Sequence, residues 1–390
     1  MTDRQFGAEQ VLGFEAALST DELGWMQKAR QFATDRILPT IEDDFDNKHF
    51  RRELVAELGA AGFLGMHLTG YGAAGASAVS YGLVCLELEA ADSGWRTFVS
   101  VQGSLAMSAI SKFGSDEQKS RWLPGMVAGE LIGCFALTEP SGGSDPAGML
   151  TTARRDGDDW VLTGSKRWIG LASIADVAVV WAKTDDGIRG FLVPTSTAGF
   201  RAEPIDGKLS MRASIQCDVF LDDVRLPASA MLPGAAGLSG PFECLNEARY
   251  GIIWGVMGAA RTCLDVAIDR SRTRQVFGKS IGEMQLTQQK LADMFLEYEK
   301  GMLLALHIGR LKDDGRLGPE QISVGKLNNV REAISIARKA RTILGGDGVT
   351  SEFPVMRHMA NLESVATYEG TDEIHTLVIG RALTGFPAFR

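Results

Sequence analysis

The hydrophobic pattern of this 390-residue chain changes its period twice, and this change is the strongest constraint on its fold. From residue 19 to about 129, apolar residues recur every three or four positions, which is the spacing of amphipathic helices. From about 131 to 230 the chain has short apolar runs separated by turn sequences such as Asp156-Gly157. From about 240 the helical spacing returns. We therefore predict an α+β protein with a β domain between two helical domains.

The boundaries of several elements carry recognisable signals. Ser19 to Glu22 form a capping box, in which a serine and a glutamate three residues apart satisfy the first helical N–H groups. Gly318-Pro319 marks another start, because proline fits the first helical position. We predict helices near 50–61, 78–92, 96–113, 116–127, 240–273, 284–313, 319–344 and 371–384, and strands at Ile132–Leu137, Trp160–Thr163, Val177–Trp181, Phe200–Ala202 and Val219–Leu221.

The order of these elements predicts three domains. No helical pattern separates the strands, so we expect an antiparallel sheet or a small barrel rather than βαβ units. The long C-terminal segments predict a four-helix bundle whose faces also contact partner subunits. The predicted domains are an N-terminal helical domain at 1–130, a middle β domain at 131–235 and a C-terminal helical domain at 236–390.

Charge and composition argue against several classes of protein. The net charge of −9 disfavours nonspecific nucleic-acid binding and a polybasic membrane surface. No stretch reaches about 18 uninterrupted apolar residues, so no transmembrane helix is expected. The 5 dispersed cysteines indicate neither a disulfide framework nor a zinc module. Met1 to Ala17 lack the features of a secretory or transit peptide, so a cytoplasmic location is expected.

Several kinds of catalytic site are absent from the sequence. The 5 histidines show no HExxH or i,i+4 pairing, so no metal site is predicted. There is no nucleophile elbow and no Walker P-loop. One GxGxxG sequence, Gly70 to Gly75, lies in the helical region without a preceding strand, so it does not support a Rossmann domain. A cofactor bound in another way remains open.

Two glycine-rich loops are candidates for binding such a cofactor. Leu137 to Pro146 follows a predicted strand and is rich in glycine and hydroxyl residues, so its backbone can approach a flat ring or an anion. Leu344 to Gly348 ends a helix and could wrap a polar ligand. The plain alternatives are a surface turn for the first loop and a glycine helix end for the second.

A third loop, Thr367 to His375, places a carboxylate on irregular backbone. Thr371 can cap the following helix, which leaves Glu369 just before that helix and beside Tyr368. A carboxyl group in an apolar pocket there would have a raised pKa and would suit a general base. The alternative is an acid that only complements the helix dipole.

Arg96 lies seven residues after Glu89, with Ser93-Gly94 between them. On one helix the two side chains would share a face, but the Ser-Gly step is expected to end that helix. An arginine beside an interior loop can clamp a carboxylate through two hydrogen bonds. A solvated surface arginine is the alternative.

Four motifs together resemble the acyl-CoA dehydrogenase family over nearly the whole chain. They are Leu137-Thr-Glu-Pro…Gly-Ser-Asp-Pro146, Arg274-x-x-Phe277-Gly278, Leu344-Gly-Gly-x-Gly348 and Thr367-Tyr-Glu-Gly-Thr371. Two more resemble the glutaryl-CoA branch of that family: Glu89-x-x-Asp-Ser-Gly-x-Arg96 and Gly240-Pro-Phe-x-Cys-Leu-Asn-x-Ala-Arg-Tyr-Gly251. The family has the same α-β-α order that the hydrophobic pattern predicts.

The resemblance implies a tightly bound FAD in a homotetramer. Segment 135–144 would line the flavin and Trp168 would pack against its ring. Arg274, Phe277, Gln285 and the 344–348 loop would reach the FAD of a neighbouring subunit. The implied cofactor-binding residues are Phe135, Leu137, Thr138, Gly143, Ser144, Trp168, Ile169, Gly170, Arg274, Phe277, Gln285, Leu344, Gly345, Gly346, Gly348, Thr371 and Glu373.

The resemblance also implies an acyl-CoA substrate and a reaction. Glu369 would remove the α-proton while the β-hydride passes to the flavin, and Arg96 would pair with the distal carboxylate of glutaryl-CoA. Loss of CO₂ would then give crotonyl-CoA, and an electron-transfer flavoprotein would accept the electrons. The implied substrate-binding residues are Glu89, Arg96, Thr97, Ser144, Phe242, Leu245, Asn246, Arg249, Tyr368 and Gly370.

Three positions depart from the family's pattern. Gly170 stands where a threonine usually donates a hydrogen bond toward the flavin, so an oxidase or a biosynthetic dehydrogenase acting on another acyl thioester is the alternative. Thr97 replaces a serine near Arg96, which leaves a slightly different diacid open, and Val276 replaces a common glutamine. A non-catalytic scaffold is a third option, which the intact Glu369 disfavours.

Overall fold

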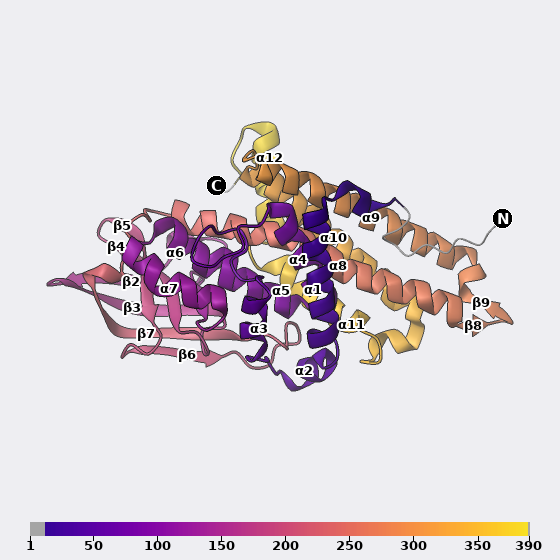
Figure 1. Ribbon diagram of the computed structural model, residues 1–390, viewed down its shortest axis with the longest axis horizontal. Coiled ribbons are helices and arrows are strands. Elements are labelled where there is room, and N and C mark those ends of the chain that lie inside the picture. The colour runs from indigo at the N-terminus through magenta and orange to yellow at the C-terminus, as the bar shows by residue number, and fades with distance from the viewer. Residues whose placement is uncertain (1–11, 389–390) are drawn as a thin grey trace.

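The computed structural model describes residues 12–388, so most of the segment Met1 to Ala17 lies outside the described residues. The chain forms a helical region, a β region and a second helical region in that order. The seven-stranded sheet lies at one end of the long axis, and the longest helices extend toward the other end (Figure 1). The predicted α+β class and its α-β-α order are confirmed.

The N-terminal helices begin with the predicted capping box, in which Ser19 and Glu22 each accept the other's backbone N–H. Helix α2 was not predicted, because four of its seven residues are acidic and mask its apolar pattern. The elements are η2 (Phe14–Ala17), α1 (Thr20–Phe32), η3 (Ala33–Ile37), α2 (Ile41–Asn47), α3 (Leu54–Ala60), α4 (Ala78–Ala91), α5 (Ser93–Val99), η4 (Ser100–Met107), α6 (Ser108–Phe113) and α7 (Asp116–Ala128).

The helix that carries Glu89 ends before Arg96, as predicted, but at a different residue. Asp92 is extended, with φ of −164°, and its Oδ1 accepts the N–H of Gly94 at 2.7 Å. Ser93 and Gly94 therefore begin α5 instead of ending α4, because the Asp92 carboxylate caps the new helix. Glu89 and Arg96 approach each other from two helices.

The β region is one sheet with the strand order β1-β4-β2-β3-β7-β6, and β5 pairs with β4. Most pairs are antiparallel, but β1–β4 and β2–β4 are parallel, so the wholly antiparallel prediction was wrong. The parallel pairs arise because the β2–β3 hairpin separates β1 from β4 in the chain, which lets β4 run in the same direction as β1. The strands are β1 (Gly133–Ala136), β2 (Thr152–Asp156), β3 (Asp159–Gly170), β4 (Val177–Thr184), β5 (Gly187–Pro194), β6 (Phe200–Pro204) and β7 (Gln216–Pro227).

The C-terminal region contains the four predicted long helices and one more. Helix α11 was not predicted, because Arg357 and Asn361 interrupt the apolar pattern on its buried face. Strand β2 was not predicted because four of its five residues are exposed and polar or charged. Strand β5 was not predicted either, although four of its residues are buried. The elements are η5 (Pro146–Gly148), η6 (Ala228–Ala230), α8 (Ser239–Thr273), β8 (Gln275–Val276), β9 (Lys279–Ser280), η7 (Ile281–Glu283), α9 (Gln285–Asp313), α10 (Pro319–Leu344), η8 (Gly345–Val349), α11 (Val355–Thr367) and α12 (Asp372–Thr384).

Helix α8 is the central helix of the molecule. It is long and apolar enough to cross a membrane by composition, but 78% of its most apolar window is buried inside the protein, as expected for a core helix. It packs closely on α4 at Gly258, where a Cβ would lie 1.9 Å from the carbonyl oxygen of Leu86. This close approach sets the position of α4, and hence of Glu89, against α8.

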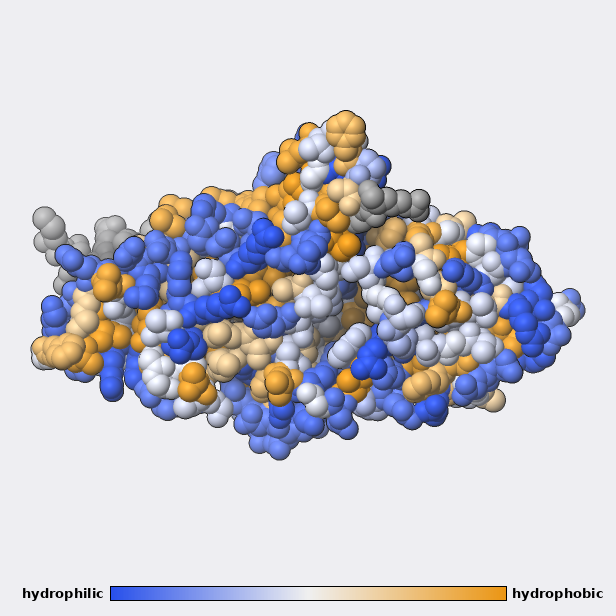
Figure 2. Space-filling view, turned by 180° about the vertical axis from the view of Figure 1, so that it is seen from behind, coloured by the Kyte–Doolittle hydropathy of each residue, from blue (hydrophilic) through white to orange (hydrophobic). Residues whose placement is uncertain are grey.

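Helix α12 projects from the body of the molecule in both views (Figures 1 and 2). Apolar side chains are visible on this projection in Figure 2. Leu383 and Phe386 at its end are 82% and 77% exposed. Large apolar groups at this exposure are a feature of surfaces that bind other proteins.

Candidate active site

The centre of the candidate site is the short loop between α11 and α12. Glu369 and Gly370 both have left-handed backbone, with φ of 59° and 94°, so the loop carbonyls need partners outside a helix. Lys326 on α10 donates to the carbonyl of Tyr368 at 2.7 Å and also to that of Gly370. Arg249 on α8 donates to the carbonyl of Glu369 at 2.7 Å. Two cations therefore hold the loop backbone.

One oxygen of the Glu369 carboxyl group is enclosed by protein. Its Oε2 is buried and has no hydrogen-bond partner among residues 12–388. Burial raises the pKa of Glu369 to about 7, although Arg249, Lys326 and Arg96 oppose this by favouring the charged form. A carboxylate with this pKa and a free oxygen can accept a proton near neutral pH, which suits a general base.

Arg96 is buried beside Tyr368, so the predicted clamp lies next to the predicted base. Its Nε donates to Oε2 of Glu89 at 2.5 Å, and its Nη2 donates to the hydroxyl of Tyr368. Thr97 Oγ1 lies 3.2 Å from that hydroxyl. Burial opposes the charge of the guanidinium, but the Glu89 carboxylate keeps the pKa of Arg96 well above its usual range. Because Tyr368 precedes Glu369 directly, the clamp and the base are linked through one peptide unit.

Gly255 on α8 provides the space for this ion pair. A Cβ at Gly255 would lie 2.1 Å from Oε2 of Glu89 and 3.1 Å from Nε of Arg96. Any side chain at this position would therefore displace the pair. Helices α4, α5 and α8 enclose the clamp together.

One face of α8 leads from the surface to the base. Phe242, Leu245, Asn246 and Arg249 recur at three- and four-residue spacing, so they lie on the same face of the helix. Phe242 is 39% exposed, Leu245 packs against the core, and Arg249 Nη1 donates to Oδ1 of Asn246 at 3.2 Å. Since Arg249 also binds the Glu369 carbonyl, this face suits a long substrate whose reacting end lies at Glu369.

The loop after β1 is anchored by a buried ion pair. Glu139 accepts the N–H groups of Leu150 and Thr151 at 2.6 and 2.9 Å, and it pairs with Lys166 at 2.9 Å. Lys166 also donates to the carbonyl of Leu137 at 3.1 Å. Sequence analysis assigned no separate role to this glutamate. The predicted loop residues lie in order from the buried strand to the surface: Phe135 and Leu137 are buried, Thr138 is half-buried, and Gly143 and Ser144 are exposed.

Trp168 lies on a β-bulge, where the register of β3 against β7 shifts between Lys166 and Ile169. Its φ is 63° and its side chain is 51% exposed, although Ile169 beside it is buried. The bulge adjoins the anchored loop, because the Arg167 N–H donates to the carbonyl of Thr138 at 2.9 Å. An exposed indole beside a glycine-containing backbone fits a flat ring such as that of a flavin.

Gly170 ends β3 just after the bulge and pairs with Gln216 on β7. A Cβ at Gly170 would lie 3.5 Å from Val101, which is ordinary contact. The fold therefore does not require a glycine here. Close packing therefore does not explain why position 170 lacks a side chain with a hydroxyl donor.

A third group of predicted residues lies at the end of the molecule opposite the sheet, around β8 and β9 (Figure 1). Phe277 and Gly278 form the two-residue turn of this hairpin, with φ of 51° and 78°, and Phe277 is 97% exposed. Arg274 and Gln285 flank the hairpin and are exposed. Within one chain this group lies away from the Trp168 bulge, so its contact with a flavin would need a second subunit and stays a prediction.

The loop 344–348 lies with that third group. Asp347 forms an ion pair with Arg270 near the end of α8, which holds the loop against the same end of the molecule. Leu344 and Gly348 are buried, and Gly345 and Gly346 are exposed. Gly345 has a φ of 67° at the end of α10, so the alternative of a glycine helix end describes its local structure.

The start of the helix that follows Glu369 is as the sequence predicts, while the cofactor contacts of Thr371 and Glu373 stay a prediction. Thr371 caps α12 by accepting the N–H of Ile374 at 3.4 Å. Glu373 is exposed in the first turn of this helix. His375 is buried beneath the loop, with Nδ1 3.1 Å from Ser323 Oγ, and a Cβ at Gly370 would lie 2.9 Å from its ring.

Lys326 was not predicted from the sequence. Its signal is a charged residue within the buried stripe of α10, four residues after Ile322 and four before Val330. A lysine at such a position is almost never buried without partners. The pattern could therefore have marked it, but only the fold shows that its partners are the carbonyls around Glu369.

A buried cluster that connects the clamp to the base was not predicted from the sequence either. Asp92 Oδ2 accepts from Arg357 Nη1 at 2.7 Å and from Asn361 Nδ2 at 2.8 Å. Asp92 caps α5, which carries Arg96, while Arg357 and Asn361 lie on α11, which leads into the Glu369 loop. The cluster therefore fixes the two functional elements relative to each other.

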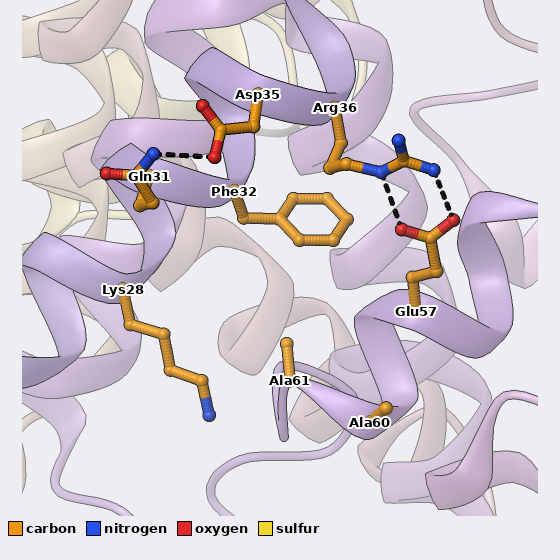
Figure 3. A pocket seen from close by; sticks show the side chains of 8 residues that line it. All are labelled: Lys28, Gln31, Phe32, Asp35, Arg36, Glu57, Ala60 and Ala61. Atoms are coloured by element: carbon orange, nitrogen blue, oxygen red, sulfur yellow. Dashed lines mark hydrogen bonds and ion pairs between the residues drawn. The ribbon is translucent and has the colours of Figure 1, made fainter.

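A groove on the N-terminal helices lies away from these residues. It surrounds Phe32 between α1, η3 and α3, and the ion pair of Arg36 with Glu57, at 2.7 Å, borders it (Figure 3). None of the predicted site residues line it. Across residues 12–388, no group of three metal-binding side chains is arranged to hold an ion.

Comparisons with known proteins match the chain over nearly its whole length. Models of the acyl-CoA dehydrogenase N-terminal, middle and C-terminal domains match residues 19–130, 134–224 and 236–384. The mitochondrial short-chain specific acyl-CoA dehydrogenase of Homo sapiens is 37% identical over 363 residues, which are 91% of this chain and 88% of that protein.

Two solved structures from Mycobacterium smegmatis are more similar than this. A crystal structure of glutaryl-CoA dehydrogenase is 61% identical, with a TM-score of 0.98, and the match covers 99% of this chain and 100% of that one. A structure of a glutaryl-CoA dehydrogenase in complex with FADH2 is 57% identical, with the same TM-score of 0.98 and coverage of 99% and 100%.

Proposed function

Because the chain belongs to the acyl-CoA dehydrogenase family, we propose that it uses FAD to oxidise glutaryl-CoA and then decarboxylates the product to crotonyl-CoA and CO₂. The observation that carries this proposal is the buried contact of Arg96 with Tyr368, which places a cation for a second carboxylate beside the base. The identity of 61% to a structure of glutaryl-CoA dehydrogenase supports the same substrate.

The residues of the β region fit the FAD of this family. The exposed Trp168 and the anchored loop that carries Gly143 and Ser144 would hold the flavin ring. When bound, FAD accepts a hydride from the β-carbon of the thioester. The chain's own contribution is to bind the thioester, orient it and take up the α-proton.

Glu369 is the group that takes this proton. Its Oε2 is buried and has no partner in the described part of the chain, so it is free to accept the proton from the α-carbon. Arg249 and Lys326 hold the backbone on which the carboxylate sits, so its position is defined before the substrate binds. Enclosure of the site limits the exchange of this proton with water.

The second step, decarboxylation, uses Glu369 and Arg96. In the dehydrogenated thioester the distal carboxylate is bonded to the γ-carbon, and the new double bond links that carbon to the thioester carbonyl, which can take up an electron pair released there. The carbon–carboxylate bond breaks, its electron pair enters a dienolate, CO₂ leaves, and protonated Glu369 returns its proton to carbon. Nε and Nη2 of Arg96 are engaged by protein, so Nη1, which has no hydrogen-bond partner across residues 12–388, is the part available to the substrate carboxylate.

Replacing Arg96 tests the substrate. Arg96→Met should lower kcat/KM for glutaryl-CoA about 100-fold, because a charge-assisted contact contributes roughly 1.5–3 kcal/mol. It should lower kcat/KM for pentanoyl-CoA, a monocarboxylyl thioester of the same chain length, by less than about threefold. Arg225→Met, which removes an exposed arginine far from the loop, is the control. Equal losses on both thioesters would contradict the clamp.

The electron acceptor separates the two candidate activities. We propose an electron-transfer flavoprotein, and crotonyl-CoA and CO₂ formed only with an added artificial acceptor would support this. An acyl-CoA oxidase is the second candidate, because Gly170 offers no hydroxyl donor to the flavin although the fold has room for one. Peroxide formed in air at the rate of substrate loss would support the oxidase. A yellow protein that no acyl-CoA reduces would contradict both.

We further propose that the chain assembles as a homotetramer. The exposed apolar residues Phe277, Leu383 and Phe386 support a subunit interface, since single chains rarely expose groups of this size to such an extent. Light scattering of the purified protein measures the assembly directly. A monomer would contradict both this proposal and the shared cofactor contacts predicted for Arg274 and Phe277.

A further inference from the structure

Lys326 is a buried lysine whose ammonium group binds the backbone on both sides of Glu369. It is 2% exposed, and Nζ donates to the carbonyl of Tyr368 at 2.7 Å and to that of Gly370. Across residues 12–388 no carboxylate forms an ion pair with it. A buried charge without a counter-charge is costly, so the groups around it decide whether it stays charged.

Among the groups that face Lys326, Glu369 is its main counter-charge. Arg249 and Arg96, from α8 and α5, are cations, and burial lowers the pKa of His375 on α12 to about 3, so this ring is neutral. Asp372 at the start of α12 is bound by Arg331 at 2.8 Å. The Glu369 carboxylate favours the charged form of Lys326 more than Asp372 does, and within residues 12–388 its Oε2 has no hydrogen-bond partner.

We propose that Lys326 is a positioning residue that holds the Glu369 loop by the carbonyls on both sides of the base, and that its positive charge keeps the base ionised. The inference rests on the proposed function, in which Glu369 is the base. The hydrogen bonds and the charge are separable contributions: the first defines where the carboxylate sits, and the second favours its charged form.

The two groups titrate in the same range of pH. Burial lowers the pKa of Lys326 to about 7, while the charge of Glu369 opposes this shift. Glu369, whose pKa burial raises to about 7, is in turn favoured in its charged form by Lys326. Removing the charge at Lys326 should therefore raise the pKa of Glu369 further.

Two substitutions separate the contributions. Lys326→Met keeps the length of the side chain but removes both the donors and the charge, whereas Lys326→Gln removes the charge and keeps donors. The infrared carboxyl band of Glu369, identified by its loss in Glu369→Gln, is titrated in each holoenzyme. We expect a higher pKa of Glu369 in both Lys326 variants and a larger loss of thermal stability in Lys326→Met than in Lys326→Gln.

Flavin bleaching by substrate gives a second readout. With the acyl-CoA that reduces the wild-type flavin, both variants should react about tenfold more slowly at about pH 7 and recover toward about pH 9, where the base is ionised again. A merely structural role would lower the rate equally at every pH. Such a uniform loss would overturn the role of the charge.

Lys208→Met is the matched control. Lys208 also donates to two loop carbonyls, those of Met211 at 2.9 Å and Ser214 at 2.6 Å, but it does not act on the Glu369 carboxyl group. It should lower stability without moving the Glu369 titration. An unmoved titration in both Lys326 variants, or an equal shift in Lys208→Met, overturns the proposal. The infrared titration needs no substrate, so it decides the role of Lys326 even if glutaryl-CoA fails to reduce the flavin.

Discussion

The smallest change that tests the clamp is one methyl group at Gly255. Gly255→Ala places a Cβ 2.1 Å from Oε2 of Glu89, where ordinary contacts begin at 3.4 Å. The carboxylate must therefore retreat by more than 1 Å, and its 2.5 Å bond to Arg96 cannot survive in its present form. Moving α8 away from α4 instead would break the close packing of the two helices at Gly258.

The magnitude follows from two opposing contributions. Alanine in place of glycine within a helix stabilises by about 1 kcal/mol. Breaking a buried ion pair costs about 3–5 kcal/mol. Gly255→Ala should therefore lower the free energy of unfolding by roughly 2–4 kcal/mol, and it should lower kcat/KM for glutaryl-CoA about tenfold relative to pentanoyl-CoA.

Gly24→Ala is the matched control for this measurement. Gly24 also lies inside a helix, α1, but a Cβ there would meet no atom within 4 Å. Urea unfolding followed by fluorescence should show Gly24→Ala to be more stable than wild type by about 0.5–1 kcal/mol. If Gly255→Ala is as stable as Gly24→Ala and keeps the preference for glutaryl-CoA, the reasoning about the ion pair is refuted.

Four further predictions concern the base and the flavin face. Glu369→Gln should keep FAD bound but slow flavin bleaching at least about 100-fold, measured by stopped-flow absorbance; persistent turnover would remove Glu369 as the base. Because burial raises the pKa of Glu369 to about 7 and the base must be ionised, the wild-type bleaching rate should rise with pH through about 7 and level off above it, and a flat profile would argue against this. Gly170→Thr should fold with unchanged stability, since a Cβ there is in ordinary contact at 3.5 Å. It should slow reoxidation of the reduced flavin by air, and an unchanged reoxidation rate would leave Gly170 without a role in this reaction. Trp168→Ala should weaken FAD binding about tenfold. Because the indole is 51% exposed, the same substitution should change the stability of the FAD-free protein by less than about 1 kcal/mol. Equal FAD affinity of the variant and the wild type in a binding titration would exclude the stacking role.

The sequence predicted those parts of the fold whose signal is local. The long helices of the C-terminal region and the capping box at Ser19 follow from periodicity and from residues a few positions apart. Helices α2 and α11 were not predicted, because polar residues interrupt their apolar patterns. The parallel direction of β1 and β4 was not predicted. It depends on the β2–β3 hairpin that lies between these strands in the chain, and no local pattern encodes this.

The sequence also carried the candidate base and clamp, since their motifs lie in short contiguous segments. The sequence motifs predict Glu369, Tyr368 and Arg96 as site residues, and the fold brings them together. The helix break at Asp92, the cluster of Arg357 and Asn361, and the lysine beneath the base were not identified.

By itself, then, the sequence determined which chemical groups the site contains: a carboxylate on irregular backbone, an arginine after a helix break, and a tryptophan that precedes a glycine where a donor is usual. Only the tertiary structure decided how these groups behave. Burial raises the pKa of Glu369, and the charges of Arg249 and Lys326, which lie on two helices far from it in the chain, limit this rise. Burial and electrostatic interaction depend on distance in space, and that distance is set only when α8, α10 and α11 pack together.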